Sequence, residues 1–393
     1  MGAMAVVEDT FNIEDEDDFS SSILDYRDLS LSSSDWTVET LFGQMNKGNI
    51  DVSPEFQRRQ VWDANKQTAF IESLILGIPV PQIVIAQNKK ERGKYIVLDG
   101  KQRLLSIMSF YDGGLRLGKP ELLKELKGLT YGEMDDVYRD AIDNSTIRAV
   151  RISGWNNDSV LYTIFHRLNS GSVSLNTQEL RFALMPGPFT RFASSFTDHD
   201  FEFARLFSES ADGPDFRMRD IELLTRYCGI VHRSDLYTGN LKEFLDQTTA
   251  WLNDLGSELT YQSYAGEAVK AISLYRDVYD LIGAYYGEKM APFTLLQDGK
   301  KPRFNRAVFD ALCFAAQDVN IRGAIASNKK EVATELGRVL ASPGFIDACS
   351  VSTKTKRSLI ARIAIWSDAL SGILGIPVKK LALDKDGKVI VDR

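Results

Sequence analysis

Five consecutive residues, Asp99-Gly100-Lys101-Gln102-Arg103, combine residue types that can bind a charged ligand. An apolar run before them predicts a strand, and the run that starts at Lys101 predicts a helix, so a glycine turn would join the two. A helix that begins there offers backbone N–H groups and the positive end of its dipole to an anion. Arg103 could donate two hydrogen bonds to phosphate oxygens, and Asp99 could hold a divalent cation or orient a water molecule.

The same five residues also have a simpler structural explanation. Aspartate is common just before a helix because its side chain accepts hydrogen bonds from the backbone of the first turn. Lys101, Gln102 and Arg103 would then lie on a solvated first turn and bind nothing. On the residue types alone we prefer this capping interpretation, and the phosphate site is the alternative.

Two other segments carry arginines, and the first of them suits a phosphate or nucleic-acid contact. The first runs from Phe56 to Trp62 and holds two adjacent arginines between aromatic residues. The second runs from Arg167 to Arg181. Each also has a plainer explanation that we prefer on the residues alone. The first would be an exposed loop anchored by its aromatic residues, and the second a helix end at Gly171 followed by a new cap at Asn176.

Several kinds of catalytic site are disfavoured by the sequence. It has no glycine-rich loop ending in Gly-Lys-Ser/Thr, and no pair of cysteines or histidines at the usual zinc spacing. Arg226 and His232 fit the loose spacing of HEPN ribonucleases, a pattern that arises readily by chance. Asp99 with Lys101 fits part of the PD-(D/E)xK nuclease pattern, but Asp386-Gly387-Lys388 supplies the same triplet elsewhere. Direct DNA cleavage by this chain is therefore an unfavoured hypothesis.

The surrounding pattern predicts the elements that would position these residues. Residues 1–34 form an acidic, serine-rich tail that we expect to be mobile. Mixed helix and strand signals cover 35–185, and helical spacing dominates 186–393 until a short strand at 389–391. The elements expected in the mixed region are helices at 36–47, 63–77, 101–111, 131–142 and 158–168, and extended runs at 50–52, 82–87, 95–98 and 146–152. Asp63 is expected to cap the second helix, and the runs at 82–87 and 95–98, which a charged turn separates, predict a hairpin.

Composition and charge set the broad class. With 393 residues, 44% hydrophobic and 26% charged, the chain is typical of a soluble globular protein. No apolar run approaches the ~18 residues of a membrane span, and no secretory signal is evident. Three widely separated cysteines predict a reduced, cytoplasmic protein. Residues 1–35 hold ten acidic residues and one basic residue, so the rest of the chain is nearly neutral and nucleic-acid binding would need a local basic patch.

Taken in order along the chain, these segments resemble one family. It is the amino-terminal domain family of GmrSD-type modification-dependent restriction systems, which has a ParB/sulfiredoxin-like fold. Any one motif is weak, but the ordered set is fairly specific and covers about residues 36–255. The matching motifs are Phe-Gln-Arg-x-x-Val-Trp at 56–62, Ser73-Leu74 with 77–81, Asp99-Gly-x-Gln-Arg-Leu104, Phe165-x-Arg167-Leu-Asn169-x-Gly171 through 178–181, and Arg217-Met-x-Asp220 with Glu222-Leu-x-x-Arg226 and Tyr237-x-Gly239.

The resemblance implies an α+β fold: a ParB/sulfiredoxin-like amino-terminal domain followed by an all-α carboxy-terminal region. It also implies a nucleotide-dependent role in restriction or anti-phage defence, with Mg²⁺ and a nucleoside triphosphate as cofactors. It favours the ligand-binding interpretation of the 99–103 turn over the capping one. The site residues it implies are Asp99, Gln102 and Arg103 for catalysis, with Asp99 also as metal ligand; Gln57, Arg58, Gly100 and Lys101 for the nucleotide; and Arg59, Arg167 and Arg181 for nucleic acid.

The sequence departs from the family pattern in two ways. Lys101 replaces the usual first glutamine, which adds a positive charge and can alter hydrolysis. No HNH nuclease segment follows, so DNA cleavage would need a partner nuclease or another defence protein. Two hypotheses result. The chain is a nucleoside triphosphatase that senses or binds DNA and acts with a partner, or it is a non-catalytic DNA-binding or adaptor protein with the same fold.

Overall fold

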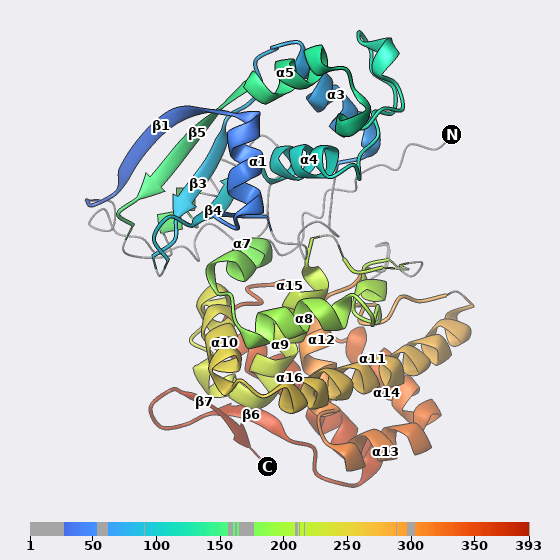
Figure 1. The fold of residues 1–393 in the computed structure, drawn as a ribbon. Coiled ribbons are helices and arrows are strands. Elements are labelled where there is room, and N and C mark those ends of the chain that lie inside the picture. Colours follow the sequence, from blue (N-terminus) through green and yellow to red (C-terminus); the bar gives the residue numbers. More distant parts are fainter. Residues whose placement is uncertain are drawn as a thin grey trace. The chain divides into compact units, whose positions relative to one another are not determined.

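The structure is a computed structural model, and its elements are drawn in Figure 1. The chain divides into two compact units, one that ends at Leu184 and one that runs from Met185 onward, and each is described by itself. The residues that the structure describes are 27–52, 62–89, 91–155, 160–161, 163–164, 177–208, 211, 213–215, 217–287, 289–296 and 303–392.

The first unit is built on a five-stranded sheet with the order β1-β5-β3-β4-β2. Strands β3 and β4 pair antiparallel, as the predicted hairpin requires, while β3 also pairs parallel with β5. The outer strand β1 pairs antiparallel with β5, and the two-residue β2 pairs parallel with β4. The strands are β1 (Ser30–Thr37), β2 (Ile50–Asp51), β3 (Ile83–Gln87), β4 (Tyr95–Asp99) and β5 (Thr146–Ser153).

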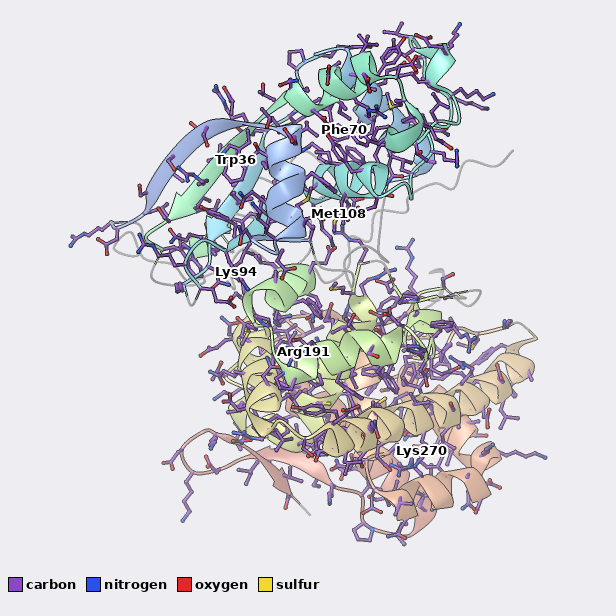
Figure 2. The ribbon with its side chains drawn as sticks, in the orientation of Figure 1. Trp36, Phe70, Lys94, Met108, Arg191 and Lys270 are labelled. Carbon is purple, nitrogen blue, oxygen red and sulfur yellow. The ribbon has the colours of Figure 1, made fainter. Side chains whose placement is uncertain are left out.

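Both faces of this sheet are covered, because side chains alternate between them along each strand. Ile83 and Ile85 contribute to one apolar core, while Val84 and Ala86 contribute to the other. The first core is closed by helices, and Figure 2 shows Phe70 among its side chains. These helices are α1 (Val38–Asn46), α3 (Ala64–Ile75), α4 (Lys101–Tyr111) and α5 (Asp136–Asn144), and α7 (Thr177–Leu184) adds Leu180 to the second core.

Strand β1 was not predicted. The expected helix at 36–47 begins only at Val38, where Thr37 caps it by accepting a hydrogen bond from the Thr40 amide. Residues 30–34, assigned from the sequence to the mobile tail, form the first part of β1 and pair with 149–153 of β5. The side chains of this edge strand are largely exposed, so its pairing rests on the backbone and leaves no apolar alternation in the sequence. Residues 1–26 lie outside the described residues.

Glu72 of α3 holds a neighbouring loop through three backbone hydrogen bonds. The buried carboxylate accepts from the amides of Glu121, Leu122 and Leu123 at 3.0, 2.8 and 2.7 Å. Burial by itself would raise the pKa of Glu72, but the three donors outweigh burial and leave the pKa below its usual value of 4.5. The charged form of Glu72 therefore stabilises the folded state.

We expect Glu72→Gln to lower the free energy of unfolding by about 1–3 kcal/mol at neutral pH, because a neutral amide is a weaker acceptor for three buried donors. The contribution of a carboxylate with a lowered pKa to the free energy of unfolding is complete above pH 4.5, the usual pKa. It is lost as the pH falls through the folded-state pKa. Urea unfolding at several pH values should thus show the difference between wild type and Glu72→Gln shrinking in acid. The exposed Glu39→Gln is the control, and a difference that does not change with pH would contradict the assignment.

The second unit is mainly helical and ends in a β-hairpin (Figure 1). The predicted α+β fold, with a sheet first and helices after it, is confirmed. The region expected to be all-α is mostly helical but also contains this hairpin, of which only the strand near 389–391 was predicted. The helices are α8 (Pro188–Thr197), α9 (Arg219–Arg233), α10 (Leu241–Leu255), α11 (Glu258–Tyr286), α12 (Arg306–Ala315), α13 (Val319–Ser327), α14 (Lys329–Leu340), α15 (Pro343–Ser350) and α16 (Lys356–Leu374), and the hairpin strands are β6 (Lys380–Leu383) and β7 (Val389–Asp392). Short 3-10 turns occur at Lys124–Leu126, Tyr131–Glu133, Ala204–Leu206 and Ser234–Leu236.

Among the described residues, the structure contains no helix with both the length and the apolar character that a membrane crossing requires.

Candidate functional site

The turn between β4 and α4 requires a glycine. Strand β4 ends at Asp99 and α4 begins at Lys101, as the sequence predicts, and Gly100 between them has a φ of +93°. A Cβ atom on residue 100 would lie 2.5 Å from Cγ2 of Ile83 on the neighbouring strand. Only glycine adopts this backbone conformation readily while packing so closely. The sharp turn thereby places the first turn of α4 directly beside the end of β4.

Asp99 and Arg103 lie together at this turn. Nη2 of Arg103 donates to Oδ2 of Asp99 and to the Gln82 carbonyl oxygen, both at 2.9 Å. The side chain of Arg103 is 11% exposed and that of Asp99 is 26% exposed, so the pair is partly accessible. The Nε atom of Arg103 is buried and has no hydrogen-bond partner among the described residues. A buried donor without an acceptor is unfavourable by about 1–3 kcal/mol, so this N–H group has capacity for an anion.

Lys101 is directed toward a carboxylate of the protein itself. Its Nζ lies 3.3 Å from Oε1 of Glu179 on α7, and both side chains are almost completely buried. The resemblance implies that Lys101 binds the nucleotide, whereas its ammonium group is paired within the protein, and the sequence did not predict this ion pair. Glu179 belongs to the 178–181 motif, which is the signal that could have pointed to it. The pair links α7 to the first turn of α4.

The other predicted site residues do not all lie at this turn. Oε1 of Gln102 accepts a hydrogen bond from the Trp62 amide at 3.2 Å, which ties α4 to the residue that follows the first arginine segment. Arg181 is fully buried, and its Nη1 donates to Oε1 of Gln178 at 2.6 Å, so in this conformation it does not present its charge on the surface. Four predicted residues, Gln57, Arg58, Arg59 and Arg167, lie outside the described residues.

The site has few groups that could bind a metal ion. Across the part of the chain that the structure describes, no three His, Cys, Asp or Glu side chains gather in one place. Mg²⁺ at phosphoryl-transfer sites is commonly held by one or two carboxylates together with water and the phosphates of the ligand. The partly exposed carboxylate of Asp99 fits that kind of site, in which the nucleotide supplies the remaining oxygen ligands.

The two residues that match the loose HEPN spacing have separate structural partners. Arg226 is buried against Asp310, with Nε and Nη2 donating to the carboxylate at 2.5 and 2.7 Å. The His232 ring stacks on Tyr264, with 3.8 Å between the ring centroids. Each side chain is thus accounted for by packing within the helical unit, and the geometry gives no support to a ribonuclease pair.

Residues 38–186 match the family model described as the GmrSD restriction endonuclease, N-terminal domain. This range contains the whole turn between Asp99 and Arg103 as well as the Lys101–Glu179 pair. No curated protein and no solved structure matches the chain.

Proposed function

We propose that the chain binds and hydrolyses a nucleoside triphosphate at the β4–α4 turn. Residues 38–186 match the GmrSD N-terminal domain family, which indicates a component of a DNA restriction or defence system. The proposed site residues are Asp99, Gln102 and Arg103, with Gly100 shaping the turn. Hydrolysis would control the engagement of DNA or of a partner such as a nuclease.

The observation that carries this proposal is the state of the Arg103 guanidinium. Its Nε is a buried donor without a partner among the described residues, and it lies at the first turn of α4 beside Asp99. A phosphate oxygen would satisfy that donor and would also be attracted by the positive end of the helix dipole. Asp99 holds the guanidinium in place through Nη2, so the donor is oriented before a ligand arrives.

Asp99 has two roles that are compatible with its place in the turn. It would hold Mg²⁺ together with phosphate oxygens, and the ion would neutralise charge on the phosphates. Its carboxylate would also orient the water that attacks the terminal phosphorus. Gln102 would fix the geometry through its contact with the Trp62 amide. Lys101 would act indirectly, because its ammonium group is already paired with Glu179.

Nucleotide binding is tested by thermal unfolding of the full chain with Mg²⁺ and a panel of nucleoside triphosphates. We expect GTP or ATP to raise the melting temperature of the wild type by several degrees, since a ligand at about 100 times its Kd adds about 2.7 kcal/mol. Arg103→Gln should lose this increase, measured from its own melting temperature. The exposed Arg92→Gln, in the turn before β4, is the control and should keep it. An increase that persists in Arg103→Gln would place the nucleotide elsewhere.

The alternative is that the chain keeps this fold as a non-catalytic DNA-binding or adaptor protein. The same Arg103 donor would then contact a DNA phosphate. This alternative requires salt-dependent DNA binding that no nucleotide affects, with no stabilisation by any triphosphate. The nucleotide panel therefore separates the two functions.

A further inference from the structure

We propose that the helical unit contains a second anion site, which takes a single phosphate group and is independent of the β4–α4 turn. The site is a small pocket lined by Glu222 and Arg226 of α9, Arg306 at the start of α12, and Thr353 and Lys354 just before α16. These residues lie outside the range that matches the family model.

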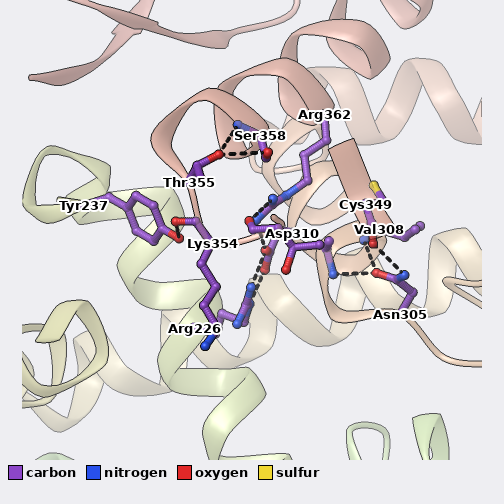
Figure 3. A network of polar contacts seen from close by, with 12 residues as sticks. Arg226, Tyr237, Asn305, Val308, Asp310, Cys349, Lys354, Thr355, Ser358 and Arg362 are labelled. Atoms are coloured by element: carbon purple, nitrogen blue, oxygen red, sulfur yellow. Dashed lines mark hydrogen bonds and ion pairs between the residues drawn. The ribbon is translucent and has the colours of Figure 1, made fainter. Parts of the chain in front are cut away.

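The pocket is backed by a buried cluster of charges (Figure 3). Arg226 and Arg362 both donate to the carboxylate of Asp310, Arg226 through two nitrogens and Arg362 through Nη2 at 2.7 Å. The side chains of Asp310 and Arg362 are fully buried. One carboxylate therefore serves two guanidinium groups, and it can neutralise only one of them.

The neighbouring Arg306–Glu222 ion pair does not remove this excess of positive charge. Nε of Arg306 donates to Oε1 of Glu222 at 3.0 Å, and this pair is also largely buried. Among the residues that the structure describes, the ion pairs of this cluster join three guanidinium groups and two carboxylates. Lys354 lines the same pocket, but it has an interaction of its own and its charge is not counted. A buried charge without a counter-ion is strongly unfavourable, so the excess positive charge favours an anion in the pocket.

The backbone around the pocket adds positive potential. Leu241 is the first residue of α10, Arg306 and Ala307 begin α12, and Thr353 and Lys354 immediately precede the Thr355 cap of α16. Three helices thus direct their positive dipole ends toward one small volume. The side chains of Asn305 and Thr355 accept hydrogen bonds from some of the first-turn N–H groups of α12 and α16. These hydrogen bonds do not cancel the dipole of either helix.

The size of the pocket selects the class of ligand. Its volume of about 10 Å³ excludes a nucleoside, so only a small group such as a single phosphate would enter. A hydrogen bond from Tyr237 to the Lys354 carbonyl oxygen, at 2.6 Å, fixes one wall of the pocket. Free phosphate and the terminal phosphate of a larger molecule share the chemistry that this wall and the arginines recognise.

The test uses the full chain and inorganic phosphate, compared with potassium chloride at the same ionic strength. Phosphate should raise the melting temperature in a saturable way, and calorimetry should give the corresponding Kd. Arg306→Gln should weaken this binding by about tenfold, which corresponds to one charge-assisted hydrogen bond of about 1.4 kcal/mol. The exposed Arg357→Gln, in the first turn of α16, should bind as the wild type does.

Two further arms identify the source of the phosphate and separate this site from the nucleotide site. The first arm tests whether a 5′-phosphorylated oligonucleotide competes with inorganic phosphate. Competition by this oligonucleotide but not by its unphosphorylated form would show that a terminal phosphate enters the pocket. Failure to compete would assign the pocket to free phosphate. Asp99→Asn should retain phosphate binding even if it loses nucleotide hydrolysis. The proposal is overturned if phosphate stabilises no more than chloride, if Arg306→Gln binds phosphate as the wild type does, or if Asp99→Asn abolishes the binding.

Discussion

Asp310→Asn is expected to lower the free energy of unfolding of the helical unit by about 3–5 kcal/mol, which is the usual loss when one partner of a buried ion pair is removed. The carboxylate is buried inside α12 and accepts hydrogen bonds from Arg226 and Arg362. An asparagine of the same size would leave both guanidinium groups buried without a counter-ion. Apolar packing at this position would remain, so the effect reports on charge.

Chemical denaturation followed by far-UV circular dichroism measures this loss. Asp280→Asn is the matched control, because Asp280 lies on α11 and is exposed. We expect the control to change the free energy of unfolding by less than about 0.5 kcal/mol. If Asp310→Asn behaved like Asp280→Asn, the description of a charge cluster organised by one carboxylate would be wrong.

Gly100→Ala is expected to have the second large effect, on both stability and ligand binding. A non-glycine residue at a φ of +93° carries about 1–2 kcal/mol of backbone strain. The added methyl group would also meet Cγ2 of Ile83 at 2.5 Å and Nε of Arg103 at 3.3 Å, and such overpacking typically adds about 1–3 kcal/mol. We therefore expect a loss of about 2–5 kcal/mol together with loss of the nucleotide-dependent rise in melting temperature.

Gly113→Ala separates the two causes. Gly113 follows the other end of α4 with a φ of +76°, and an added Cβ there would meet no atom within 4 Å. Gly113→Ala has the same kind of backbone strain as Gly100→Ala but no steric clash. The difference between the two variants in the free energy of unfolding, measured in urea, therefore gives the contribution of the close packing of the turn against β3. Equal losses in Gly100→Ala and Gly113→Ala would mean that the turn can shift without cost.

Much of the first unit could be predicted because its signals are local. The β3–β4 hairpin follows from two β-branched runs separated by a charged turn, and Asp63 caps α3 by accepting from the Lys66 amide. The start of α4 at Lys101 follows from the glycine turn at Gly100. Each of these features depends on residues within a few positions of one another, so composition and spacing are sufficient to indicate them.

The features that were missed depend on distant residues. Lys101 and Glu179 are 78 positions apart, and Asp310 is 84 and 52 positions from its two arginines. The sequence offers only a weak sign of the second case, a single carboxylate inside the apolar run of α12. Strand β1 was missed for another reason, because its exposed serines carry no apolar pattern and its partner β5 lies far along the chain.

Phosphate release from GTP and ATP with Mg²⁺ tests most directly whether Asp99 and Arg103 form a nucleotide-hydrolysing site. Wild type, Asp99→Asn and Asp112→Asn should be compared as full chains, with Asp112 as an exposed carboxylate at the other end of α4. We predict turnover by the wild type and by Asp112→Asn, and a reduction of about 10²–10⁴ in kcat for Asp99→Asn. No phosphate release from either nucleotide, or an unchanged rate in Asp99→Asn, would show that Asp99 and Arg103 do not form a hydrolytic site.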